Sequence, residues 1–115
     1  MIHSFGDRQF QTWFYRVSHG ELLIRSPRSA SNLENIDLMF FGVVYMALPR
    51  FLPVLDICSP TDEEIVNVRA IVGVHAEHSS VFVLRCRGDR FLVAAASMRV
   101  NVNQLDIFDL PFERE

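Results

Sequence analysis

Residues 36–48, IDLMFFGVVYMAL, are the most apolar stretch of this chain and decide its fold. A helix is one alternative, but Gly42 at the centre and the Val-Val-Tyr content favour a β-strand. Side chains alternate between the two faces of a strand. One face would carry Leu38, Phe40, Val44 and Met46, and the other Met39, Phe41, Val43 and Tyr45. Both faces are therefore apolar, which is typical of a strand that is covered on both sides.

Both apolar faces of this strand must be packed against other parts of the structure. One helix cannot cover a sheet on both faces, so the second cover is expected to be another sheet layer or another subunit. Gly42 has no side chain to pack, and an isolated glycine in a strand often marks a bulge or bend. We therefore expect Gly42 to be the point where the strand moves from one sheet to another.

Two β-hairpins are predicted on either side of this strand. The first joins residues 9–18 (QFQTWFYRVS) to residues 21–26 (ELLIRS) through His19-Gly20. The second joins residues 80–87 (SVFVLRCR) to residues 90–102 (RFLVAAASMRVNV) through Gly88-Asp89. A two-residue connection that contains glycine between two strand-like runs indicates a hairpin. Residues 55–58 (LDIC) are predicted to form a further short strand.

A short helix is predicted to begin at Thr61. Thr61 and Glu64 have the spacing of a capping box, and the acidic run 62–64 complements the positive end of the helix dipole. Gly73 is suited to the position just after the last turn. The apolar stripe that should face the sheet consists of Ile65, Val68, Ile71 and Val72.

Together these elements predict one globular domain over residues 1–115 of the α+β class. It is mainly antiparallel β, with two hairpins, a long central apolar strand and one short helix, in the order ββββ-α-ββ. A chain of 115 residues is long enough to bury one core without metals or disulfides. Residues 105–115 include Pro111 and are expected to be irregular.

Charge and composition exclude several classes of function. The net charge of −3 argues against a nucleic-acid-binding protein, which would present a basic face. All eleven basic residues are arginine, which excludes a Schiff-base or P-loop lysine. The apolar run 38–48 is too short to span a membrane, and residues 1–10 do not have the pattern of a secretory signal. We therefore expect a cytoplasmic protein in which Cys58 and Cys86 are reduced, buried thiols.

Three groups of residues are candidates for a small-molecule or metal site. Arg25 and Arg28 lie close together in sequence and could cradle a phosphate or an acidic segment. Asp37 and Asp56 interrupt apolar segments; each would bond loop amides or an arginine, or line a pocket. The metal candidates are His75, Glu77 and His78, although this spacing lacks the rigid helical geometry of a metalloenzyme motif. No cofactor-binding motif and no catalytic residue is predicted.

The aromatic content favours association over catalysis. Ten phenylalanines are more than one small core with a single helix requires. The candidate interface residues are Trp13, Phe14, Phe41, Tyr45 and Phe51. The sequence thus favours a non-enzymatic protein–protein interaction module, either a homodimer or a small adaptor, regulator or inhibitor that docks on a protein partner. The alternative is a small-ligand-binding domain or minor enzyme with a pocket between helix and sheet.

Overall fold

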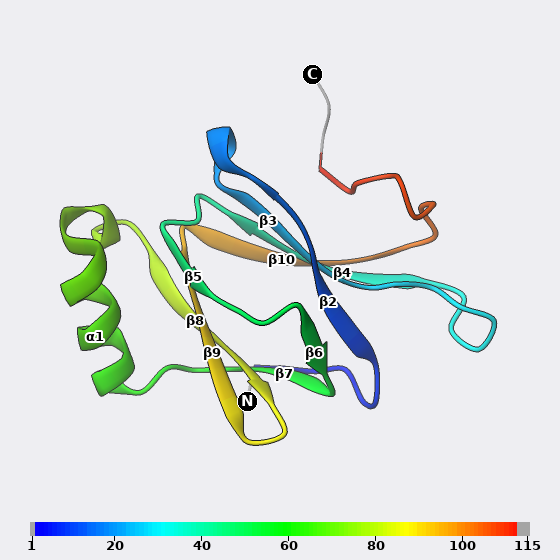
Figure 1. The fold of residues 1–115 in the computed structure, drawn as a ribbon, viewed down its shortest axis with the longest axis horizontal. Coiled ribbons are helices and arrows are strands. Elements are labelled where there is room, and N and C mark those ends of the chain that lie inside the picture. Colours follow the sequence, from blue (N-terminus) through cyan, green and yellow to red (C-terminus); the bar gives the residue numbers. More distant parts are fainter. Residues whose placement is uncertain (1, 113–115) are drawn as a thin grey trace.

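The computed structural model describes residues 2–112 and confirms the predicted fold class, mainly antiparallel β with one short helix (Figure 1). The first sheet, called sheet A, has the order β1-β7-β8-β9-β5, and sheet B has the order β10-β4-β3-β2-β6. Sheet A consists of β1 (His3–Ser4), β7 (Leu55–Cys58), β8 (Ser80–Cys86), β9 (Asp89–Ala95) and β5 (Tyr45–Ala47). Sheet B consists of β10 (Ser97–Asn103), β4 (Asn35–Phe41), β3 (Glu21–Ser26), β2 (Gln9–Arg16) and β6 (Phe51–Pro53).

The main core lies between the two sheets. The longer strands contribute alternate residues to it, as the period of two requires. Its buried members from sheet B include Phe10, Leu22, Ile24, Leu38, Phe40 and Leu52, and those from sheet A include Leu55, Ile57, Leu84, Cys86, Val93 and Ala95. One face of the predicted central strand is therefore covered by a second sheet, one of the two expected covers.

Gly42 is the point where the central strand changes sheets, as predicted. The strand ends in sheet B at Phe41 and continues in sheet A from Tyr45, with Gly42 at φ +65°. Its neighbour makes the same change in reverse, from β9 in sheet A through Ala96 to β10 in sheet B. A Cβ atom on Gly42 would lie 3.0 Å from the Cβ of Ala96. The bend therefore needs glycine for both backbone conformation and space.

The other face of the central strand is covered by the C-terminal segment, residues 104–112. Leu110 and Phe112 of this segment pack with Leu23 and Met39 in a second hydrophobic cluster, which also contains Trp13, Phe14 and Phe41. The expected second sheet layer is thus present, but the other cover is this segment and not the helix, which contacts β8 of sheet A. The segment has no periodic pattern, so its role as a cover gave no signal in the sequence.

The predicted order ββββ-α-ββ differs in detail from the structure. Within residues 2–112, seven strands precede the helix and three follow it. The additional strands β1 and β6 span two and three residues, too few to show an alternating pattern, and β5 is the end of the predicted central strand beyond Gly42. The predicted second strand of the C-terminal hairpin is divided into β9 and β10, because the chain changes sheets at Ala96.

The helix α1 (Asp62–Val72) lies beside β8 on the outer side of sheet A (Figure 1). The capping box is formed: the Glu64 amide donates to Thr61 Oγ1 over 3.1 Å, and the Thr61 amide donates to Glu64 Oε1 over 2.8 Å. Val68 is the buried residue of the helix. Ile71, predicted to face the sheet, is instead exposed, because the contact with β8 is narrower than the predicted stripe.

Glu64 should make the stability of the fold depend on pH. Hydrogen bonding to Arg90, followed by the cap contacts with Thr61, lowers its pKa from 4.5 to about 2. Its ionised form therefore stabilises the fold above about pH 4.5, and this contribution is lost as the pH falls toward 2. We expect Glu64→Gln to lower the free energy of unfolding at pH 7 by about 1 kcal/mol. The difference from the unmodified protein should shrink below pH 4.5 in urea denaturation series. Glu63→Gln, in the same helical turn, is the control, and an equal loss there would contradict this role.

Candidate functional site

A buried ion pair lies at the centre of the outer face of sheet B. Arg25 on β3 and Asp37 on β4 are directly opposite each other in the strand register. Arg25 Nε is 2.7 Å from Asp37 Oδ1, and Nη2 is 3.0 Å from Oδ2, a bidentate contact. Both side chains are fully buried. The expectation that Asp37 would bond an arginine is thus confirmed, and this carboxylate is committed to holding two strands together.

The ion pair extends into a network that holds the C-terminal segment. Asn103 donates to Asp37 Oδ2 over 2.8 Å, and Asn35 donates to Asn103 Oδ1 over 2.8 Å. Two contacts then reach the segment's backbone. Arg25 Nη2 donates to the carbonyl of Asp109 over 2.9 Å, and Asn35 Nδ2 donates to the carbonyl of Leu105 over 2.9 Å. An otherwise irregular segment is therefore fixed at two points by side chains of the sheet.

Arg25 is poorly placed to bind a ligand. Among the described residues its Nη1 has no hydrogen-bond partner, but the ring of Trp13 lies 5.5 Å from the guanidinium carbon. A cation–π contact of this kind stabilises the positive charge of the guanidinium without a hydrogen bond. Arg28 is exposed and 3.9 Å from Asp106. The two arginines border a hollow of about 130 Å³, but only Arg28 presents its guanidinium to solvent there.

Asp56 belongs to a separate and more exposed pair. It lies on β7 in sheet A, where Arg85 Nη2 is 3.0 Å from Asp56 Oδ2. The hydrogen bond from Arg85 lowers the pKa of Asp56 below its usual value. Asp37 and Asp56 therefore stand in different sheets, each with its own arginine. The structure does not bring them together as an acid–base pair or with Arg25 and Arg28 in one ligand site.

The two cysteines are buried and unpaired, as expected. Cys86 belongs to the main core, and burial raises the pKa of its thiol from 9.0 to about 11. The thiolate, which is the reactive form, is therefore scarce at neutral pH. Cys58 ends β7 and is also buried. Neither position favours a catalytic nucleophile.

The metal triad suggested by the sequence is not assembled. His75 lies in the short 3-10 helix η2 (Gly73–Ala76), and Glu77 and His78 follow it. All three residues are exposed. Over residues 2–112 no group of three or more His, Cys, Asp or Glu side chains is arranged to hold a metal ion. Because η2 is a single tight turn, it does not direct these three side chains to one point.

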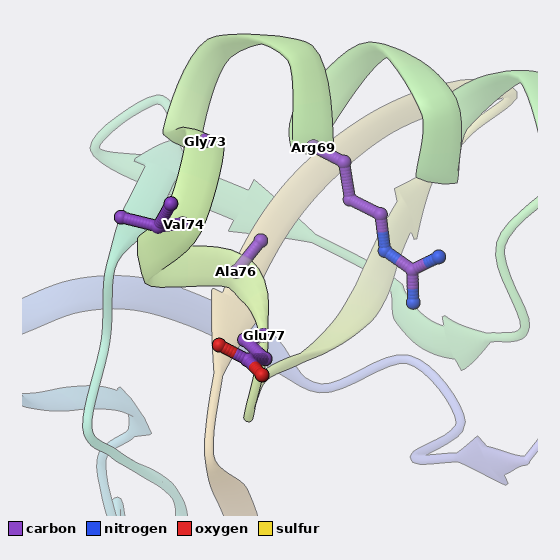
Figure 2. Close-up of a pocket in the computed structure, with 5 residues that line it drawn as sticks. All are labelled: Arg69, Gly73, Val74, Ala76 and Glu77. Atoms are coloured by element: carbon purple, nitrogen blue, oxygen red, sulfur yellow. The ribbon is translucent and has the colours of Figure 1, made fainter.

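The same turn borders a hollow on the surface of the molecule. The hollow has a volume of about 600 Å³ and is lined by Arg69, Gly73, Val74, Ala76 and Glu77. Figure 2 shows η2 folding back beneath the end of α1, with Ala76 between the side chains of Arg69 and Glu77. A positive φ of +67° at Gly73 allows this reversal of direction. The hollow combines an apolar floor with one charge of each sign at its border.

The predicted aromatic interface is largely used within the chain. Trp13, Phe14 and Phe41 pack against the C-terminal segment, and Tyr45 is half-buried. Phe51, on the edge strand β6, is exposed, with Arg50 stacked on its ring at 5.0 Å. Exposed apolar residues outside this predicted interface include Val66, Ile71, Val74, Ile107 and Phe108. Ile107 and Phe108 had a local signal, because they form an apolar pair between two aspartates.

Comparison with known proteins does not assign a function. No protein-family model matches the chain, and no curated protein or solved structure is significantly similar to it. Within residues 2–112, no helix is long and apolar enough to cross a membrane. Function therefore has to be argued from the surfaces and side chains of this chain itself.

The Arg25–Asp37 pair predicts a large difference between two matched substitutions. Asp37→Asn would leave a buried guanidinium without its counter-charge and should lower the free energy of unfolding by about 3 kcal/mol. Asp56→Asn makes the same change in a partly exposed pair and should cost less than about 1 kcal/mol. Urea denaturation of both variants measures the two losses. Equal losses would contradict the assignment of Arg25–Asp37 as the structural centre of sheet B.

Trp13 is the single tryptophan and reports on the C-terminal segment. Phe112→Ala should destabilise the fold by about 3 kcal/mol and shift the tryptophan emission to longer wavelength, because the segment no longer covers the indole. Phe108→Ala removes an exposed ring of the same segment and should leave the emission unchanged. A spectrum insensitive to Phe112→Ala would mean that the segment does not cover Trp13 in solution.

Proposed function

We propose that this chain is a non-enzymatic protein–protein interaction module that self-associates through the outward surface of α1 and η2. The observation that supports this most directly is the apolar character of that surface. Val66, Ile71 and Val74 are all exposed, Val74 by 80%. A helix on the surface of a monomer normally turns polar residues to water, so apolar residues on its outer side favour a partner. Val66 and Ile71 lie about 140° apart around α1, on the two flanks of its outward surface. We name these two residues and Val74, with the hollow that Val74 borders, the docking face.

The groups that an enzyme would use are committed elsewhere, which supports the non-enzymatic interpretation. Asp37 and Asp56 are each paired with an arginine, and the Cys86 thiol has a raised pKa. Catalytic residues usually lie in a cleft with a perturbed pKa and open access to substrate. Two buried, unpaired cysteines also support our proposal of a cytoplasmic location.

A small-ligand-binding protein is the second candidate, and the hollow beside η2 favours it. Its volume of about 600 Å³ is within the range of ligand pockets. It lies between the end of α1 and η2 and not between the helix and a sheet, where the sequence suggested such a pocket. A thermal-shift screen of metabolites distinguishes the two candidates. Only a ligand-binding domain should be stabilised in a saturable manner, and that stabilisation should be lost in Arg69→Gln.

Self-association predicts a measurable mass in solution. Light scattering at about 100 µM, a concentration at which weak interfaces are populated, should give at least twice the monomer mass of 13.2 kDa. Val66→Gln with Ile71→Gln should return the mass to that of the monomer, because polar side chains lower the gain from burying the docking face. Val17→Gln with Leu33→Gln changes two exposed apolar residues outside this face and is the control. A mass unaffected by the first pair would contradict the proposal.

A further inference from the structure

The turn that follows β10 carries two apolar residues that the fold does not use. The Asp109 amide donates to the Asp106 carbonyl over 3.0 Å, which places Ile107 and Phe108 at the two corner positions of a turn. Phe108 is 88% exposed and Ile107 is 54% exposed. Corner positions normally carry Gly, Asn, Asp, Pro or Ser. Ile107 and Phe108 depart from this preference and gain no packing within the fold. Departures of this kind are expected at functional positions.

The turn is held in place on both sides. The Ile107 amide donates to Asp106 Oδ1 over 3.0 Å, and the backbone on either side is bonded to Arg25 and Asn35 of the buried network. Beyond the turn, Leu110 and Phe112 pack on sheet B. The two exposed side chains are therefore presented from a fixed backbone, which lowers the entropic cost of binding.

The hollow in the docking face has the chemistry to receive this turn. Its exposed apolar lining is Val74, which is 80% exposed, and its volume of about 600 Å³ is large enough for a phenylalanine ring. The charges are also complementary. Arg69 and Glu77 border the hollow, while Asp109 belongs to the turn and Arg28 lies beside it, 3.9 Å from Asp106. Arg28 is already paired with Asp106, so the contact that the two surfaces offer is between Asp109 of the turn and Arg69 of the hollow.

One molecule cannot make this contact with itself. β10 leads the chain away from the side occupied by α1, and the following segment (orange to red) lies at the opposite side of the fold in Figure 1. The longest dimension of the molecule is 44 Å. We propose that the Asp106–Asp109 turn of one copy inserts Ile107 and Phe108 into the hollow beside η2 of a second copy. This rests on the proposed function, and names the occupant of its docking face.

The contact between the turn and the hollow allows two kinds of assembly. Two copies lying antiparallel can exchange turns and close a twofold dimer. If only one turn is engaged per pair, the contact is head-to-tail and copies add in a chain. In both cases every contact needs one intact turn and one intact hollow, so the two halves can be tested separately.

Sedimentation equilibrium of the full chain over a dilution series tests the proposal. Phe108→Ser and Val74→Ser each alter a highly exposed side chain, and each should weaken self-association at least about tenfold. Leu33→Ser, which removes an exposed apolar side chain from another loop, should leave it unchanged. Arg69→Glu and Asp109→Arg should each weaken association alone, and the variant that carries both should recover it, since the opposite pair is restored with reversed signs.

The outcomes separate this inference from the proposed function. If the unmodified protein associates, and Val66→Gln with Ile71→Gln abolishes association while Phe108→Ser does not, the docking face stands and the turn is not its occupant. If Phe108→Ser weakens association but Val74→Ser does not, the turn binds elsewhere, and the assignment of the hollow is overturned. If the unmodified protein remains monomeric throughout the series, self-association through either surface is overturned.

Discussion

The fold depends on two neighbouring strands changing sheets at the same point. At Gly42 and Ala96 the chain leaves one sheet and enters the other twice, in opposite directions, and the ladder persists across the bend. The Ala96 amide donates to the Phe41 carbonyl over 2.9 Å, and the Val44 amide donates to the Ala94 carbonyl over 2.9 Å. Because the backbone groups stay paired there, the bend carries little hydrogen-bonding penalty. It also joins the two sheets covalently, so neither can move away from the core independently.

This bend accounts for what the sequence could and could not predict. The Val-Val-Tyr content of residues 36–48, their two apolar faces and the glycine at their centre were enough to predict a strand shared between two layers. The capping box of Thr61 and Glu64 was likewise a local signal, and it placed the helix correctly. Leu110 and Phe112 could not be placed, because they lie in an aperiodic segment and contact strands that are far away in sequence. Ile71 was misplaced because helical period alone does not tell how wide the contact with a sheet is.

The candidate sites also include features that the sequence could predict and features that it could not. Asp37 within an apolar strand indicated a bonded carboxylate, but its partner depended on the register of β3 against β4, which sequence pattern does not determine. Once formed, the Arg25–Asp37 pair favours this register over its neighbours. If either strand slipped by one residue, its charged side chain would turn toward the main core and the other would lose its partner. The pair thereby contributes to the specificity of the fold, even where its net contribution to stability is small. The missed surface on α1 had no such marker, since exposed and buried valines are identical in sequence.

The buried network also connects the interior of sheet B to the exposed turn. Arg25 uses one edge of its guanidinium for Asp37, and its Nη2 also donates to the Asp109 carbonyl. Asn35 similarly bonds both Asn103 and the carbonyl of Leu105. The backbone on both sides of Ile107 and Phe108 is therefore fixed by the residues that define the strand register. Fully buried charges thus hold a segment without regular structure, while its exposed pair Ile107 and Phe108 adds little to the stability of the fold. This arrangement is what the proposed contact with a second copy requires.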